Sequence, residues 1–285
     1  MKISYLLNAA ILIIFCCASS SCKRQEEVLT SLQKEDTQIA TSAFATNVKM
    51  QEIKGGYYKP FYSSDSDALI KVEPFLMDER PVTNAEFLAF VKANPQWKRS
   101  AIKRIYADTT YLHNWVSDTA LPKNALPNAP VTYVSWFAAK AYATAVGKRL
   151  PTLDEWEFVA MADETSINAR NKKTYSNNIL NLYLIKNRQY NAVKLSTPNY
   201  WGIYNMFDLV WEWTDDFNSV LINGESRSGD YNDKNLVCAG SATSATDVLN
   251  YAAFMRYGFR SSLKANYTIS NLGFRCANSI SNKTK

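Results

Sequence analysis

Near its start, the folded part of the chain alternates between apolar and polar residues, which is the pattern of strands. Residues 50–62 alternate around Gly55-Gly56 and predict a pair of strands with aromatic flanks. Val72–Met77 predicts the next strand. Beyond residue 162 the chain breaks into short stretches rich in Asn, Ser, Gly and Tyr, so we expect mostly short strands and turns there.

Three helices are predicted from the residues that precede them. Thr83 and Asn84 are N-cap residues before an amphipathic stretch over 86–91. Ser135 caps a helix predicted over 136–146, and Thr152 caps a helix predicted to run through Ala162. Gly147 supplies the left-handed residue that ends the second helix, and Glu155 completes a capping box at the third. A few helices among many short strands and long loops predict an α+β fold.

The N-terminus has the pattern of an export signal. Lys2 precedes an apolar run of about ten residues, Leu6–Phe15, which is too short to span a bilayer as a stable helix. Small residues then lead to Cys22, as at a bacterial lipoprotein cleavage site, although Ser19 stands where a larger aliphatic residue is more usual. We predict cleavage before Cys22 and lipidation of that cysteine, with plain secretion and an uncleaved anchor as the alternatives.

The chain therefore divides into four parts. Residues 1–21 are the predicted lipoprotein signal peptide, and 22–47 are a polar tether of mixed charge. A single folded domain is predicted over 48–278, followed by a frayed polar tail over 279–285. This organisation predicts a membrane-anchored protein of the bacterial cell envelope, facing either the periplasm or the cell surface.

Composition excludes some classes of function. The 285 residues are 47% hydrophobic and 13% aromatic, ample for a packed core. The net charge of +6 is mild and the Lys and Arg residues form no dense block, which argues against nucleic-acid binding. The chain has one His, so a mononuclear iron centre supplied mainly by His is excluded.

Only two cysteines remain in the predicted mature domain. Cys16 and Cys17 leave with the signal peptide and Cys22 is predicted to be lipidated, so Cys238 and Cys276 are left. Two thiols in an oxidising compartment predict one disulfide. Two free buried thiols or a thiolate metal site are the alternatives.

Five sequence blocks carry a family resemblance. They are Pro81–Phe87, Pro130–Trp136, Lys148–Glu157, Val210–Thr214 and Ser270–Ala277. In this order and spacing they resemble the formylglycine-generating enzyme (sulfatase-modifying factor) family. The resemblance covers nearly the whole domain and implies an irregular relative of the C-type lectin fold.

Each of these blocks also has a purely structural interpretation. Arg149 and Arg275 are expected to hold buried carboxylates by two hydrogen bonds each, because a loop-rich fold pairs few backbone groups in ladders. The tryptophans of these blocks are expected to be core rings more often than ligand contacts: Trp136, Trp156, Trp211 and Trp213.

The resemblance also identifies positions where chemistry is missing. Active members of the family use two cysteines that bind copper(I) and activate oxygen to oxidise a substrate cysteine. Counting from the flanking motifs places those positions at Ser244 and Ala252. Copper(I) needs soft thiolates, so we expect no formylglycine-generating oxidase activity and no catalytic residue of that kind.

Other family sites are partly retained. Trp213, Ser241 and Tyr251 fall where the family contacts its substrate peptide, and they either shape a peptide groove or persist as scaffold. The family's calcium site is altered, since Leu209 replaces an Asn ligand. Asp208 and Glu212 remain candidates for a cation, with a structural role for Glu212 as the alternative.

A narrower resemblance concerns Tyr251–Leu263 with Val237-Cys238 ahead of it. This run resembles a branch of the family encoded beside copper-type nitrite reductases, described as accessory proteins. We therefore expect a non-catalytic protein that binds a protein segment or supports maturation or assembly of an envelope redox or surface complex. The alternative is a metal-dependent oxidoreductase or copper chaperone that uses Cys238 and Cys276.

Overall fold

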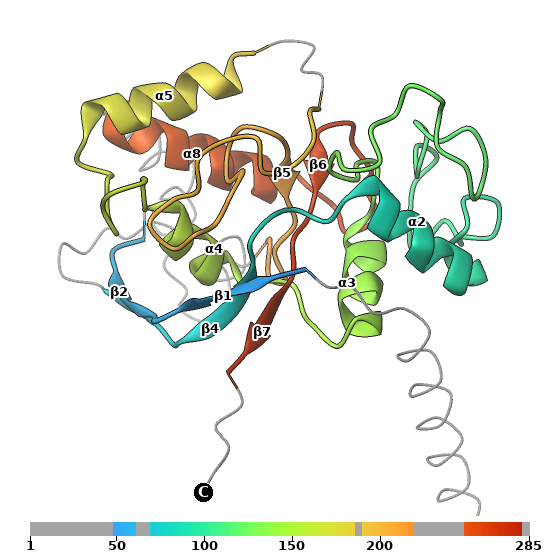
Figure 1. Ribbon diagram of the computed structural model, residues 1–285, viewed down its shortest axis with the longest axis horizontal. Helices are drawn as coiled ribbons and strands as arrows, with labels where there is room; N and C mark the ends of the chain where they lie inside the picture. Colours follow the sequence, from blue (N-terminus) through green and yellow to red (C-terminus); the bar gives the residue numbers. More distant parts are fainter. Residues whose placement is uncertain (1–47, 61–68, 186–189, 219–247, 281–285) are drawn as a thin grey trace, which may run out of the picture. The chain divides into compact units, whose positions relative to one another are not determined.

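The computed structural model describes residues 48–60, 69–185, 190–218 and 248–280 (Figure 1). These residues belong to one compact unit, 46–285. The predicted signal peptide, Cys22 and the tether lie outside the described residues, as do Cys238, Ser241 and Ser244. No helix within the described ranges is long and apolar enough to cross a membrane.

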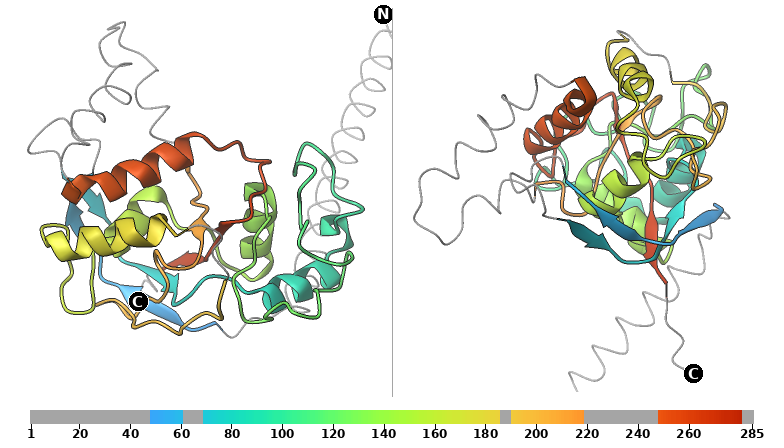
Figure 2. Two further views of the ribbon diagram at one scale, coloured as in Figure 1. Left: turned by 90° about the horizontal axis from the view of Figure 1, so that it is seen from above. Right: turned by 90° about the vertical axis from the view of Figure 1, so that its left-hand side faces the viewer.

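A three-stranded antiparallel sheet forms one layer of the domain. Its order is β1 (Met50–Ile53), β4 (Phe75–Asp78) and β7 (Ala277–Ser279), with β4 in the middle. The sheet pairs a strand from the start of the domain with one from its end. Figures 1 and 2 show helix α4 (Leu153–Ala160) lying on this sheet, with α5 (Lys173–Tyr183) and α8 (Val248–Ser261) beyond it.

The predicted pair of strands around Gly55-Gly56 is wrong in its partners. β1 pairs with β4, whereas β2 (Gly56–Tyr58) pairs with β3 (Ile70–Val72) in a separate sheet. The chain turns at Gly55, whose φ is +69° and where a Cβ would lie 2.3 Å from the Val72 carbonyl oxygen. Only glycine fits that corner.

The strand predicted over 72–77 is two strands. β3 ends at Val72 and β4 begins at Phe75. Pro74 lies between them, and proline cannot donate to a ladder, so the pairing changes partner at this point.

The three predicted helices are present with their predicted caps. α2 (Asn84–Ala93) and α4 each begin with a complete capping box, at Thr83 and at Thr152. Ser135 caps α3 (Trp136–Ala145) through the Ala138 amide. Short local signals were enough to place these helices because each cap lies within three residues of the backbone that it satisfies.

Two further helices were not predicted. α5 (Lys173–Tyr183) and α8 (Val248–Ser261) pack against one another, as Figure 2 shows. The N-cap of α5, Lys172, makes no side-chain cap, and the helix is rich in Asn, Ser and Tyr, which have modest helix propensity. α8 contains Gly258. Mutual packing, rather than local preference, therefore stabilises this pair.

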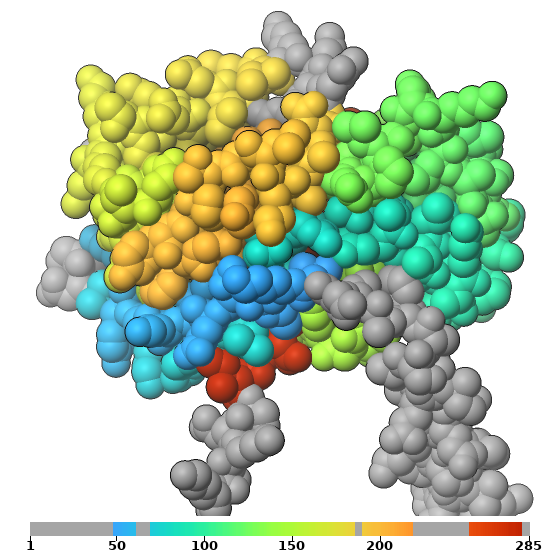
Figure 3. All heavy atoms as spheres, in the orientation of Figure 1, coloured from blue at the N-terminus to red at the C-terminus, as the bar shows by residue number. Residues whose placement is uncertain are grey.

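The remaining described elements are short. η1 (Pro95–Trp97) follows α2, and β5 (Trp211–Glu212) pairs in parallel with β6 (Leu272–Gly273). Gly273 is needed there, because a Cβ would lie 2.6 Å from the Val131 carbonyl oxygen. Figure 3 shows part of the segment 190–218, which contains β5, crossing one face between α5 and β1.

A buried ion pair joins these short elements. Arg275 donates from Nε and Nη2 to the two carboxylate oxygens of Glu212 at 2.7 and 2.8 Å, and both side chains are 0% exposed. Trp156 of α4 donates its indole N–H to the same carboxylate at 2.7 Å. Arg275 also donates to three backbone carbonyls, those of Asp78, Tyr204 and Asn205. The expected partnership of Arg275 with a buried carboxylate is present. Arg149 also holds a carboxylate by two bonds, of 2.6 and 2.7 Å, but its partner Glu155 is half-buried rather than buried.

A second buried carboxylate joins α4 to α8. Glu157 accepts from Arg256 Nε at 2.8 Å and Nη2 at 2.6 Å, and from Arg260 Nη1 at 2.8 Å. Burial alone would raise the pKa of Glu157, but the attraction of Arg256 and Arg260 outweighs it and lowers the pKa below its ordinary value. Glu157 therefore stays ionised within the core.

We predict that breaking the Glu212–Arg275 pair strongly destabilises the domain. Glu212→Gln leaves a fully buried guanidinium without an anion, so the free energy of unfolding should fall by about 3–5 kcal/mol. Urea denaturation measures this change. The matched control is Asp215→Asn in the exposed Lys140–Asp215 pair, where at most about 1 kcal/mol is expected. Equal losses for the two variants would contradict a central role for Glu212.

We predict that acid weakens the domain partly through Glu157. Its folded-state pKa lies below 4.5, so the stability that it confers is present above that pH and is lost as the pH falls toward the folded-state value. Glu157→Gln should therefore flatten the fall in unfolding free energy below about pH 4.5. An unchanged acid slope, measured by urea titration at several pH values, would show that Glu157 is not the titrating group.

Candidate functional site

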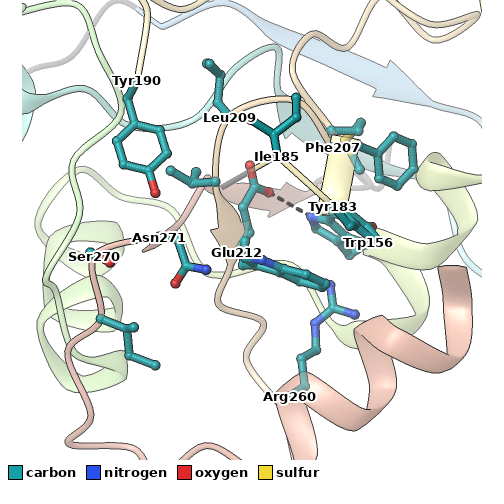
Figure 4. Close-up of a pocket in the computed structure, with 14 residues that line it drawn as sticks. Trp156, Tyr183, Ile185, Tyr190, Phe207, Leu209, Glu212, Arg260, Ser270 and Asn271 are labelled. Carbon is teal, nitrogen blue, oxygen red and sulfur yellow. Dashed lines mark hydrogen bonds between the residues drawn. The ribbon is translucent and has the colours of Figure 1, made fainter. Parts of the chain in front are cut away.

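The main pocket lies where α5, α8, β5 and the chain before β6 meet, and its volume is about 420 Å³. Aromatic and aliphatic side chains form most of its wall, together with Glu212, Arg260, Ser270 and Asn271 (Figure 4). Each wall comes from a different stretch of sequence. Buried ion pairs, ring contacts and the β5–β6 pairing hold those stretches together around the pocket.

An aromatic stack forms one wall of the pocket. Trp211 of β5 stacks on Tyr183 at the end of α5, with ring centroids 4.6 Å apart, and lies 4.5 Å from the ring of Phe259 on α8. Trp211 is partly exposed, unlike Trp156 and Trp213, which are 2% and 0% exposed. Trp211 is thus held between a ring of α5 and a ring of α8, and it joins the two helices to β5.

The charged groups of the pocket are unequal. Glu212 is neutralised by Arg275, whereas Arg260 shares the carboxylate of Glu157 with Arg256. Two guanidinium groups against one carboxylate leave one positive charge in excess. The Arg260 guanidinium carbon also lies 4.5 Å from the centroid of the Trp156 ring, a cation–π contact.

The predicted groove residues are not brought together at this pocket. Trp213 is fully buried, donates its indole N–H to the Val134 carbonyl at 2.9 Å and packs edge-on against Phe217. Tyr251 is 39% exposed on α8, where it stacks on Phe254. Neither lines the pocket. With Ser241 outside the described residues, the peptide groove stays a prediction.

The position predicted for the second family thiol, Ala252, lies within the described residues. Ala252 is 3% exposed on α8. It adjoins a cavity of about 30 Å³ that is also lined by Tyr58, Glu157 and Arg256. That volume holds little more than one water molecule, and its walls offer no sulfur ligand apart from the thioether of Met161. The first thiol position, Ser244, lies outside the described residues.

Cys276 lies in the core and forms no disulfide with any described residue. It is 0% exposed, and its backbone N–H donates to Asp78 Oδ2 at 3.3 Å. Burial, reinforced by the nearby negative charge of Asp78, raises the pKa of Cys276 well above its ordinary value. The thiol is therefore held protonated at neutral pH. The predicted pairing with Cys238 stays a prediction, because Cys238 lies outside the described residues.

The two cation candidates are engaged in different ways. Both oxygens of Glu212 accept hydrogen bonds from Arg275, and one also accepts from Trp156, so Glu212 has a structural role. Asp208 accepts from Asn205 through Oδ2, and its other oxygen is buried without a partner. The described ranges contain no group of three or more His, Cys, Asp or Glu that could hold a metal. The residues present here do not fit a calcium ion, which prefers six to eight oxygens.

The sequence motifs missed the roles of Arg256 and Arg260. Both lie in the run Tyr251–Leu263 that carried the narrower resemblance, but their partner Glu157 is 99 and 103 residues away. Their spacing of four residues was the available signal, since it places both on one face of a helix. That signal needed the stretch to be recognised as helical.

Comparisons with known proteins agree with the family motifs. Residues 35–280 match the model of the sulfatase-modifying factor enzyme 1-like domain. A formylglycine-generating enzyme of Streptomyces coelicolor is 30% identical over 256 residues, covering 73% of this chain and 79% of that protein. The inactive Cα-formylglycine-generating enzyme 2 of Bos taurus is 26% identical over 274 residues, covering 81% of this chain and 88% of its own.

Solved structures with a similar course of the chain include those of CarF and of PvdO from Pseudomonas aeruginosa. Each has a TM-score of 0.44, with 17% and 18% identity, and they cover 82% and 81% of this chain and 98% and 94% of their own. The predicted α+β, C-type-lectin-like fold with few helices and many short strands is confirmed. On the match over residues 35–280, the chain belongs to the formylglycine-generating enzyme (sulfatase-modifying factor) family.

Proposed function

We propose that this chain is a non-catalytic member of its family that acts as a binding or accessory protein. The observation that carries the proposal is the buried methyl group of Ala252 at the place of a catalytic thiol. Copper(I) requires soft ligands, and a methyl group has no lone pair to offer. The similar inactive protein of Bos taurus is consistent with a family scaffold that persists without this chemistry.

The surroundings of Ala252 support the same conclusion. Arg256 lines the same small cavity, so a copper cation bound beside Ala252 would meet a guanidinium within a nearly closed space. Glu157, the carboxylate of that cavity, is already paired with Arg256. The scaffold is retained around a position that no longer supplies a ligand.

The proposed partner is a protein segment in the cell envelope. The domain would be attached to the membrane through lipid on Cys22 and would support maturation or assembly of an envelope redox or surface complex. The export pattern of residues 1–22 supports this placement. No nucleic acid is proposed as a partner, given the mild charge of +6.

A copper chaperone that uses Cys238 and Cys276 is less well supported. A copper ligand must be reachable and deprotonated, whereas Cys276 is 0% exposed and burial raises its pKa well above the ordinary value. Recruitment of Cys276 would require the chain around β7 to open. The non-catalytic accessory role needs no such rearrangement.

We predict that the purified protein, loaded with copper(I), does not convert a cysteine-containing peptide to its aldehyde. Oxygen uptake should stay at the level of the copper blank, because Ala252 cannot bind the metal. Mass spectrometry of the peptide measures the product. The formylglycine-generating enzyme of Streptomyces coelicolor serves as the positive control. Copper-dependent aldehyde formation by this chain would overturn the proposal.

We predict that Cys22 carries acyl chains in the cell. A palmitate analogue should label the wild-type protein, and the label should be lost in Cys22→Ser. Cys17→Ser, which lies within the predicted signal peptide, is the matched control and should retain the label. Label that persists in Cys22→Ser would contradict the lipid anchor and leave the non-catalytic assignment untouched.

A further inference from the structure

One surface turn of the domain groups basic and apolar side chains. The turn follows α2 and η1 over residues 98–106, and its last four residues are all exposed: Lys103, Arg104, Ile105 and Tyr106. Ile105 is 70% exposed. The chain has no acidic residue between Glu86 and Asp108, so every charge of this turn is positive: Lys98, Arg99, Lys103 and Arg104.

A second turn adds another cation beside the first. The Asp108 N–H donates to the Asn266 carbonyl at 2.8 Å, and the Trp136 N–H donates to the Ala265 carbonyl at 3.0 Å. Lys264, which precedes Ala265, is exposed. Two carboxylates lie nearby, and both are already engaged: Asp108 accepts from the Thr110 and Thr268 amides, and Asp118 accepts from the Ser100 amide. Five positive side chains against two negative ones leave an excess of three.

The exposed cations of these turns have no anionic partner among the described residues. Lys103, Arg104 and Lys264 form no ion pair there. By comparison, Leu195 is 73% exposed, but Lys194 beside it pairs with Glu79 at 2.8 Å. Single exposed apolar residues are normal on a protein surface. Ile105 differs because its neighbours are cations that the described residues leave unneutralised.

The first turn is held in its conformation by the rest of the domain. The Tyr106 N–H donates to the Lys103 carbonyl at 2.9 Å. The Tyr106 ring centroid lies 6.1 Å from that of Trp97 and 5.4 Å from that of Phe137. Arg99 Nη1 donates to the Trp115 carbonyl at 2.9 Å, which joins this turn to the next one. A surface that is already ordered loses little conformational entropy when it binds.

The length of chain before the domain allows this turn to reach a membrane. Residues 22–47 separate Cys22 from the first described residue, and a chain of that length spans at most about 90 Å. A domain of this size has a radius of gyration of about 17 Å. Attachment at Cys22 therefore does not decide which face of the domain meets the bilayer, and the chemistry of the surface decides it.

We propose that a basic–apolar surface docks on a bilayer that contains anionic phospholipid. The surface consists of Lys103, Arg104, Ile105, Tyr106 and Lys264. Its cations contact lipid phosphates, Ile105 enters the boundary between headgroups and acyl chains, and Tyr106 lies at the level of the headgroups. This inference rests on the proposed membrane attachment of the chain, and it assigns the face on which the attached domain lies.

The test measures how well lipid protects Lys103. The full-length chain is reconstituted into vesicles of phosphatidylcholine, with or without phosphatidylglycerol, and a membrane-impermeant reagent acetylates exposed amines. Mass spectrometry gives the rate at Lys103 relative to Lys54, which is exposed between β1 and β2. Phosphatidylglycerol should lower this ratio at least about fivefold, the attraction expected for one cation at an anionic surface. The same ratio in both kinds of vesicle would overturn the proposal, as it would if this surface bound an acidic protein instead.

Variants locate the contact. Arg104→Glu combined with Ile105→Ser should return the ratio to its value in phosphatidylcholine, and protection that persists in this folded variant would contradict the assignment. The matched control, Lys173→Glu with Ile167→Ser, changes exposed residues at and before the start of α5, and protection should remain. Figures 1 and 2 show α5 at the opposite end of the domain from α2. Thermal unfolding checks that both variants are folded.

Salt gives an independent check, and the two proposals fail separately. At about 1 M NaCl the Debye length falls to about 3 Å, so most of the protection of Lys103 should be lost. Protection that is insensitive to salt would contradict an electrostatic contact. Palmitate labelling tests the anchor at Cys22, whereas the acetylation ratio compares the same reconstituted chain on two lipid surfaces.

Discussion

The rest of this structure depends on the pairing of Glu212 with Arg275. The carboxylate fixes β5 and, through Trp156, the helix α4, whereas the guanidinium fixes β4 and the chain at residues 204–205 through their carbonyls. A domain with such short strands pairs few backbone groups in ladders, so side chains must satisfy the others. Both partners are 0% exposed, and water therefore screens the pair little.

The second buried carboxylate, Glu157, also joins elements through arginine, but here two arginines share one carboxylate. One arginine, Arg256, is satisfied by it through two nitrogens, and Arg260 is left with a buried donor that nothing described accepts. Replacing either arginine by an apolar side chain would have removed the imbalance without leaving an unpaired anion. This imbalance of charge lies beside a pocket, and it distinguishes this part of the core from the neutral Glu212–Arg275 pair.

The parts of the fold that the sequence could predict are those that local contacts decide. Thr152 and Glu155 satisfy backbone amides within one turn, so these four residues are enough to specify where α4 begins. α5 has no such cap, and it forms because α8 covers it. At the site, the assignment of Ala252 to a family thiol position stays a prediction, because it was made by counting from motifs; the structure adds that this side chain is buried on α8. The role of Arg260 depends on a partner about a hundred residues away, and the role of Trp211 depends on partners several tens of residues away. No local sequence pattern records such distant contacts.

The geometry of α8 shows that the side chain at position 252 can vary while the scaffold persists. Ala252, Arg256 and Arg260 recur every four residues and are 3%, 6% and 2% exposed, so they lie along the one face that meets the core. The two arginines anchor that face to Glu157 of α4 whatever side chain stands at position 252. A change of side chain at position 252 therefore leaves both ion pairs in place, and if the predicted family thiol stood there, its exchange for a methyl group would remove a metal ligand without removing an ion pair.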